Sequence, residues 1–286
     1  MGLTGMILYV VAAPLLGIAA TFLSKTGAAR LFGYDQPLFH EILTDLLNGI
    51  RQAPLPGERP PIFSTVVYMA GAAIAGAMFW YGSSLVVAAL VWFVAAMVIP
   101  GALWIKSTSG SWLQSPNEGT DGVVGEVLWI AARFFQLALF AIGLFLVSVF
   151  GAGAGSFQVS DALSMGGAPV YYLPGCFFGM AALLAFYPRK PVEHWALAVD
   201  ATGRNLVFLQ FGQHYEQVLF YSIVFLLHYG GGATAFLSLL ICLLLAVLSS
   251  LLAAIRWRWL DRPEVAAAIY IVSFLAPIIN LVLLLG

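Results

Sequence analysis

Eight stretches of mostly apolar residues, each roughly 20 residues long, are the feature that most limits how this chain can fold. About 20 apolar residues in a helix cross the roughly 30 Å hydrocarbon layer of a bilayer. Backbone amides in hydrocarbon need internal partners, so continuous runs of this kind predict helices. The sequence therefore predicts an all-α integral membrane protein with a single transmembrane domain over residues 1–286. The expected spans cover residues 5–24, 63–81, 84–105, 123–150, 168–187, 206–228, 235–255 and 265–285.

The scarcity of charged side chains supports this prediction. Charged residues make up 9% of the chain and hydrophobic residues 62%, whereas a soluble domain carries about 25% charged residues. The net charge is −1 and no basic cluster is present, which argues against a nucleic-acid partner. Cys176 and Cys242 lie in apolar runs without a CxxC spacing, so neither a metal site nor a cofactor is expected.

The positions of the positive charges predict the orientation. Eleven of the 12 Lys and Arg residues fall in the loops that join spans 1 and 2, 3 and 4, 5 and 6, and 7 and 8. Cytoplasmic loops are rich in Lys and Arg, so we expect these loops in the cytoplasm and both termini on the opposite side. The first cation, Lys25, follows the first apolar run, which is the reverse of the charge order in a cleavable signal peptide. Span 1 is therefore expected to be retained.

Residues 37–51 predict a short amphipathic helix after span 1. Apolar residues recur every three or four positions between Leu38 and Ile50, and Glu41 and Asp45 lie on the polar face. The segment is too short to cross the bilayer, so we expect it at the membrane interface or against a partner. Glu41 and Asp45 are candidate partner-docking residues, with a solvated helix face as the alternative.

Ionisable side chains at membrane depth are costly and mark candidate functional sites. Glu126 and Arg133 lie about 10 Å apart on one face of span 4. Arg133 either pairs with a group from another helix or extends to the interface. His214 and Glu216 belong to the polar segment 213–217, which lies within span 6 or caps a helix that begins near Gln217. We take these four ionisable residues as candidates for a proton path. No catalytic-triad, phosphate-loop or metalloprotease motif is present, so no catalytic residue is expected.

Three stretches of the sequence carry a resemblance to a known family. The first comprises Pro14 to Lys25, Ala28-Ala29-Arg30-Leu31, Gln36-Pro37-Leu38 and Leu43-Thr44-Asp45-Leu46-Leu47. The second runs from Ser109-Gly110-Ser111-Trp112 to Gly122-Val123-Val124-Gly125-Glu126, and the third runs from Arg256 to Arg262-Pro263. Together with eight spans, outside termini and an interfacial helix after span 1, these stretches resemble the family of membrane anchor subunits that is found in respiratory complex I, in membrane-bound nickel–iron hydrogenases and in formate hydrogenlyases.

The resemblance implies a non-catalytic subunit in the cytoplasmic (inner) membrane of a bacterium or archaeon. Its implied partners are antiporter-like membrane subunits, lipid, and a cytoplasmic hydrogenase-like or quinone-reductase-like module, and the complex would translocate protons. Glu193 and Asp200 are the only acids between spans 5 and 6, where the family has an acid-rich loop, and Arg133 lies in span 4, where members place a glutamate. These departures weigh against quinone as a ligand. Glu193 and Asp200 remain docking candidates.

Two other classes of function stay open. A stand-alone transporter or channel would have two related halves with helices broken at the midplane. Pro100-Gly101 and Pro174-Gly175 interrupt spans 3 and 5, but no internal repeat is evident. A membrane-embedded enzyme acting on lipid or isoprenoid would need clustered acids or histidines at the interface, for which Glu193-His194 and Asp200 are the candidates.

Overall fold

The structure, a computed structural model, describes residues 2–32, 39–53, 61–108, 158–164 and 202–229, together with residues 240, 244 and 275. These residues form helices and no β-strand, apart from one isolated bridge between Ser84 and Gln158. The all-α prediction is thus confirmed for this part of the chain. The helices are α1 (Leu3–Phe32), α2 (Phe39–Arg51), α3 (Ile62–Tyr81), α4 (Leu85–Thr108), α6 (Val159–Ser164) and α10 (Gly203–Tyr229).

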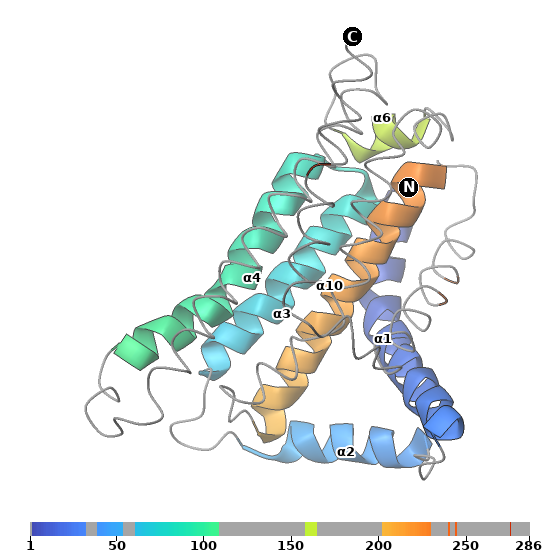
Figure 1. Ribbon diagram of the computed structural model, residues 1–286. Coiled ribbons are helices and arrows are strands. Elements are labelled where there is room, and N and C mark those ends of the chain that lie inside the picture. The colour runs from blue at the N-terminus through green and yellow to red at the C-terminus, as the bar shows by residue number, and fades with distance from the viewer. Residues whose placement is uncertain are drawn as a thin grey trace.

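Four long helices form a bundle, with α2 across one end and α6 at the other (Figure 1). Helix α3 is central because it packs against α1, α4 and α10. Helices α3 and α10 run in the same direction, since Thr65 bonds to Asn205 near the α2 end and Trp80 bonds to Ser222 farther along both helices. Helices α1 and α4 run the opposite way (Figure 1).

Glycines allow these helices to approach one another closely. Gly71 faces Ala95 of α4, Gly76 faces the Tyr9 ring of α1, and Gly212 of α10 faces Tyr68 of α3. A methyl group at any of the three positions would overlap its neighbour. Small residues at helix contacts are the usual means of close packing in apolar bundles.

The turn from α3 to α4 is set by Gly82, which has φ +97°. Its N–H donates to the carbonyl of Phe79 at 3.0 Å, and the N–H of Ser83 donates to that of Met78 at 3.0 Å. This pair of bonds is a Schellman motif, which ends a helix on a left-handed residue. The N–H of Val159 donates to the Ser83 carbonyl at 3.1 Å, so α6 is attached to the same turn.

The helix bounds differ from the expected ranges by three residues or fewer, except at the end of α1. Helix α1 continues to Phe32, eight residues beyond the expected end, because residues 25–32 contain no proline and Ala28 and Ala29 favour helix. Helix α10 begins at Gly203, which rules out a helix that starts near Gln217. Expected spans 123–150 and 168–187 lie outside the described residues, as do 235–255 and 265–285 apart from three single residues.

Within the described residues, α3 is the one helix that is long and apolar enough to cross a membrane. Leu3–Ala19 and Val86–Ile99 are shorter apolar helical segments. Length and composition of this kind are also found in buried helices of soluble proteins, so the eight spans stay a prediction.

Candidate functional site

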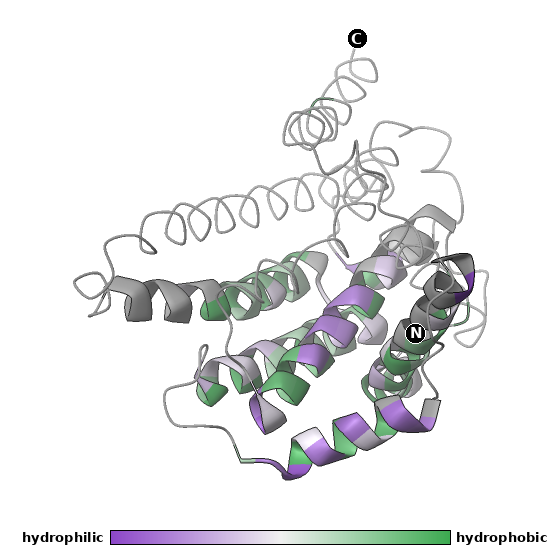
Figure 2. Cartoon of the chain, turned by 60° about the horizontal axis from the view of Figure 1, so that its bottom comes forward, coloured by the Kyte–Doolittle hydropathy of each residue, from purple (hydrophilic) through white to green (hydrophobic). Residues whose placement is uncertain are grey.

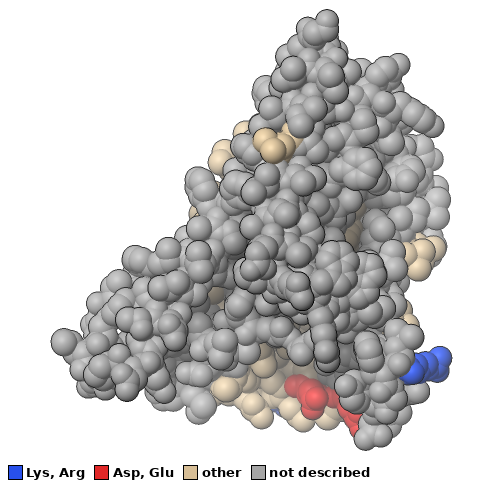
Figure 3. Space-filling model, viewed as in Figure 1, with Lys and Arg blue, Asp and Glu red and all other residues tan. Residues whose placement is uncertain are grey.

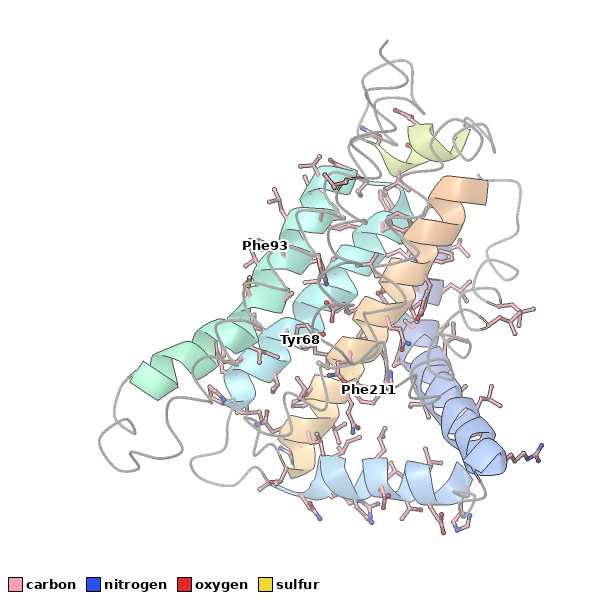
Figure 4. All side chains as sticks on the ribbon, viewed as in Figure 1. Tyr68, Phe93 and Phe211 are labelled. Carbon is pink, nitrogen blue, oxygen red and sulfur yellow. The ribbon has the colours of Figure 1, made fainter. Side chains whose placement is uncertain are left out.

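The middle of α10 carries a glutamate that is fully enclosed by the bundle. Glu216 is 0% exposed. The indole N–H of Trp92 on α4 donates to Glu216 Oε1 at 2.8 Å, and the hydroxyl of Tyr68 on α3 donates to Oε2. Both donors are themselves buried. Three helices therefore meet at one carboxyl group, and Figure 4 shows Tyr68 in the layer between α3 and α10.

The helical repeat places these side chains. Helix α10 is marked by hydrophilic residues among apolar ones (Figure 2). One set of buried residues on α10 recurs every three or four positions, and so does one set on α3, so each helix presents a continuous stripe to the core. The stripe of α10 consists of Asn205, Leu209, Gly212, Glu216 and Leu219, and that of α3 of Thr65, Tyr68, Ala72, Ala75 and Phe79.

Two of the glycines bring the donors within reach of the carboxyl. Gly212 lies one turn before Glu216, and a Cβ there would stand 2.5 Å from Cδ1 and Cε1 of the Tyr68 ring. Gly71 faces Ala95, one turn along α4 from Trp92. The absence of a side chain at each position lets α3 approach both α10 and α4.

The two donors differ in what they can do chemically. An indole N–H can only donate, whereas a phenol hydroxyl can donate or accept. Burying an ionised carboxylate is costly unless hydrogen bonds compensate it, and Trp92 and Tyr68 provide such bonds. The same site accepts the protonated acid, because the Oε2 hydroxyl would then donate to Tyr68. Both carboxyl oxygens of Glu216 thus keep a hydrogen-bond partner whether the group is ionised or protonated.

A second buried polar pair lies nearer the α2 end. Thr65 Oγ1 is 2.6 Å from Asn205 Oδ1 and 2.8 Å from the Ile62 carbonyl oxygen. A hydroxyl has one hydrogen, so it donates to one of these acceptors at a time. An Asn205 side chain turned by 180° would donate its N–H to Thr65 and satisfy both groups. Thr65 and Asn205 are 0% exposed and link α3 to α10.

Aromatic residues fix α1 and α3 against α10 on the other side of Glu216. The Tyr9 hydroxyl donates to the Tyr215 carbonyl at 2.7 Å, and the Tyr215 hydroxyl donates to the Val10 carbonyl at 2.8 Å. The Tyr9 ring also stacks on Trp80, with centroids 6.3 Å apart. Trp80 donates to Ser222 Oγ at 3.1 Å. These contacts hold the helices together, and each hydroxyl is committed to an acceptor.

The structure separates two of the four proton-path candidates. His214 packs against Gly17 of α1, whereas Glu216 faces α3 and α4. Two residues of α-helix turn a side chain by about 200°, so the two groups lie on opposite sides of α10. Glu126 and Arg133 lie outside the described residues, as do Glu193 and Asp200.

Helix α2 is attached to the first turn of α10. Arg204 Nε donates to the Ile50 carbonyl at 3.0 Å, and the Arg204 backbone N–H donates to the Gln52 carbonyl at 3.2 Å. A cation at a helix C-terminus is favourable for the helix dipole. Glu41 and Asp45 are exposed on α2, and Figure 3 shows acidic side chains at this end of the bundle. The docking candidates on α2 are therefore accessible.

The residues that sequence reasoning missed are the partners of Glu216. Tyr68 and Trp92 lie in spans that carry no charge, and nothing in their own segments indicates an acidic neighbour. A usable signal was present on α3, where Thr65 and Tyr68 are polar-tipped side chains on the face that also carries Ala72 and Gly76. Among the described residues, no group of three or more His, Cys, Asp or Glu side chains could hold a metal ion.

Comparisons with models of known protein families and with curated proteins found no match.

Proposed function

We propose that this protein is a non-catalytic membrane subunit of a complex I-like or membrane-bound hydrogenase-like assembly, which anchors a cytoplasmic module and contributes to proton translocation. The observation that carries the proposal is Glu216, a fully buried carboxyl in the middle of an apolar helix bundle. An ionisable residue at membrane depth is expensive and by default marks a transport pathway or relay. Its hydrogen bonds with Tyr68 and Trp92 suit both protonation states.

The charges at the two ends of the bundle support the orientation in this proposal. Arg30, Arg51 and Arg204 are exposed at the end where α2 lies. The opposite end carries Asp161 on α6. Positive charge collects on the cytoplasmic side of membrane proteins, so we assign the α2 end to the cytoplasm. With this assignment, α1, α3, α4 and α10 correspond to spans 1, 2, 3 and 6. Spans 1 and 3 would run from the outside to the cytoplasm and spans 2 and 6 in the opposite direction, as expected for eight spans with both termini outside.

The position of α2 supports a docking role. It lies across the bundle end that we assign to the cytoplasm, and its Glu41 and Asp45 carboxyls are exposed. A soluble module with basic residues would meet these acids on approach. Glu126, Arg133 and His214 remain candidates for other parts of the proton path, and Glu193 and Asp200 for the docking surface.

The test of proton movement is Glu216→Gln in the assembled complex, measured with a pH-sensitive dye in sealed vesicles. We expect the driving reaction to continue while coupled proton movement falls at least about tenfold, as for loss of a proton-transfer group. Asp161→Asn removes an exposed carboxyl at the opposite end of the bundle, on α6, and serves as the control. Proton movement at the wild-type rate in Glu216→Gln would refute this part of the proposal.

The test of the assembly is purification of the chain in mild detergent with identification of what accompanies it. We expect an antiporter-like membrane subunit and a hydrogenase-like or quinone-reductase-like soluble module, with crosslinks from Glu41 or Asp45 to the latter. Purification of the chain alone, with crosslinks from α2 to lipid only, would favour a stand-alone transporter instead.

A further inference from the structure

We propose that Tyr68 is the residue through which the Glu216 carboxyl exchanges its proton, on the side of the bundle that faces α2, and that Trp92 is a positioning residue. The inference rests on the proposed proton-handling role of Glu216. It names the oxygen that takes the proton and the direction from which the proton arrives.

The two oxygens of Glu216 are not equivalent. Oε1 accepts the Trp92 indole N–H at 2.8 Å, and an indole cannot accept a hydrogen bond in return. A proton on Oε1 that pointed toward Trp92 would meet the indole hydrogen and find no acceptor there. The acidic proton of Glu216 is therefore carried on Oε2, the oxygen that bonds to Tyr68.

The Tyr68 phenol next to Oε2 can take up one proton and give up another, so it is neutral before and after the transfer. The arriving proton, delivered by water from the α2 side, binds to the Tyr68 oxygen while the phenol's own proton moves to Oε2. The O–H bond of Tyr68 breaks as the new one forms, so Tyr68 ends neutral and the Glu216 carboxylate becomes a carboxylic acid. Release of the proton toward α2 follows the same steps in reverse.

The direction follows from where buried polar side chains continue beyond Tyr68. Thr65 lies one turn toward the α2 end of α3 and bonds to Asn205. In the opposite direction the buried stripe of α3 is apolar through Ala72, Ala75 and Phe79. On that side the buried Tyr9 hydroxyl, which lies against Gly76, donates to the Tyr215 carbonyl. The next pair of buried polar side chains, Trp80 with Ser222, starts 12 residues or about 18 Å along α3 from Tyr68. The polar path thus opens toward α2.

Infrared spectroscopy of the purified full-length chain in lipid nanodiscs tests the inference. The protonated carboxyl band of Glu216 is the band that Glu216→Gln removes. Transfer from H₂O to D₂O shifts this band, and the rate of the shift measures proton exchange at Oε2. Tyr68→Phe and Trp92→Phe form a matched pair, because each removes one hydrogen-bond donor and keeps an aromatic ring.

We expect Tyr68→Phe to slow the exchange at least about tenfold, as for loss of a proton-transfer group. Trp92→Phe should leave the rate within about threefold and move the band to higher frequency, because the Oε1 carbonyl loses its donor. Thr65→Val should slow the exchange and Ser222→Ala should not. Helix content and thermal unfolding identify any variant that fails to fold.

Exchange at the wild-type rate in Tyr68→Phe would overturn the inference, and so would equal slowing by Tyr68→Phe and Trp92→Phe. The absence of a Glu216 carboxyl band over the whole pH range in which the protein stays folded would also overturn it. These readouts need no assembled complex. If Tyr68→Phe slows exchange while Glu216→Gln leaves coupled proton movement intact, the exchange route stands and the proposed function fails.

Discussion

Replacement of Gly212 by alanine tests whether close helix contact is what brings Tyr68 to Glu216. The added methyl would stand 2.5 Å from Cδ1 and Cε1 of the Tyr68 ring, and 3.3 Å from the Cα of Met69. Ordinary contacts at such a carbon begin near 3.4 Å. The ring therefore has to move by about 1 Å, whereas the α3 backbone needs to yield much less.

The energetic effect is a balance of two terms. Alanine in place of glycine inside a helix stabilises it by roughly 0.5–1 kcal/mol. Forcing extra volume against the buried Tyr68 ring costs about 1–3 kcal/mol. Gly101→Ala on α4 is the matched control, because a Cβ there meets nothing within 4 Å. Relative to Gly101→Ala, Gly212→Ala should be less stable by about 1–3 kcal/mol.

Thermal unfolding in detergent, followed by circular dichroism, compares the two variants. The infrared band of the Glu216 carboxyl reports the hydrogen bond itself, and we expect it to shift in Gly212→Ala and not in Gly101→Ala. If both variants gain the same stability and neither moves the band, then Gly212 does not set the position of Tyr68, and the reasoning from helix contact to site geometry is wrong.

Three further changes probe the packing around the site. Trp92→Phe leaves a buried carboxyl oxygen without its indole donor and should destabilise the protein by about 1–3 kcal/mol, as measured by thermal unfolding. The same substitution made in the Glu216→Gln variant should cause a smaller loss of stability. Thr65→Val removes a buried hydrogen-bond partner of the Asn205 amide and should cost about 1–3 kcal/mol; no loss in the same unfolding assay would contradict the buried pair. Gly49→Leu should push α2 away from α10, because even a Cβ there lies 2.7 Å from a Val207 methyl, and faster hydrogen exchange of the α2 amides would reveal it.

Helix positions were the part of the fold that could be predicted from sequence. Apolar runs and the three- to four-residue repeat of α2 correspond to helices at 62–81, 85–108, 203–229 and 39–51. The end of α1 was missed because the prediction placed it where the apolar run stops. A drop in hydrophobicity indicates where a span leaves the bilayer, whereas the helix itself continues for as long as the residues favour helix. Residues 25–30 are polar or small, yet helical.

The site could be predicted only in part. Glu216 was identifiable because a lone acid in an apolar segment is costly wherever it points. Its partners Tyr68 and Trp92 come from helices 148 and 124 residues away in sequence, and pairing over such distances is decided by tertiary packing. The link to His214 was based on proximity along the chain, whereas the helical turn places the two residues on different sides of α10.

Because α2 is attached to Gly203 and Arg204 at the start of α10, a movement of α2 would also move the middle of α10. Glu216 is the middle residue of the helix that runs from Gly203 to Tyr229. If the far end stays fixed, a sideways shift of about 2 Å at the attached end displaces Glu216 by about half as much, because a helix moves as a rigid rod. Directed away from α4, that displacement would lengthen the 2.8 Å bond to Trp92 by about 1 Å, beyond hydrogen-bonding range. Force applied to a surface helix would in this way reach a carboxyl in the interior.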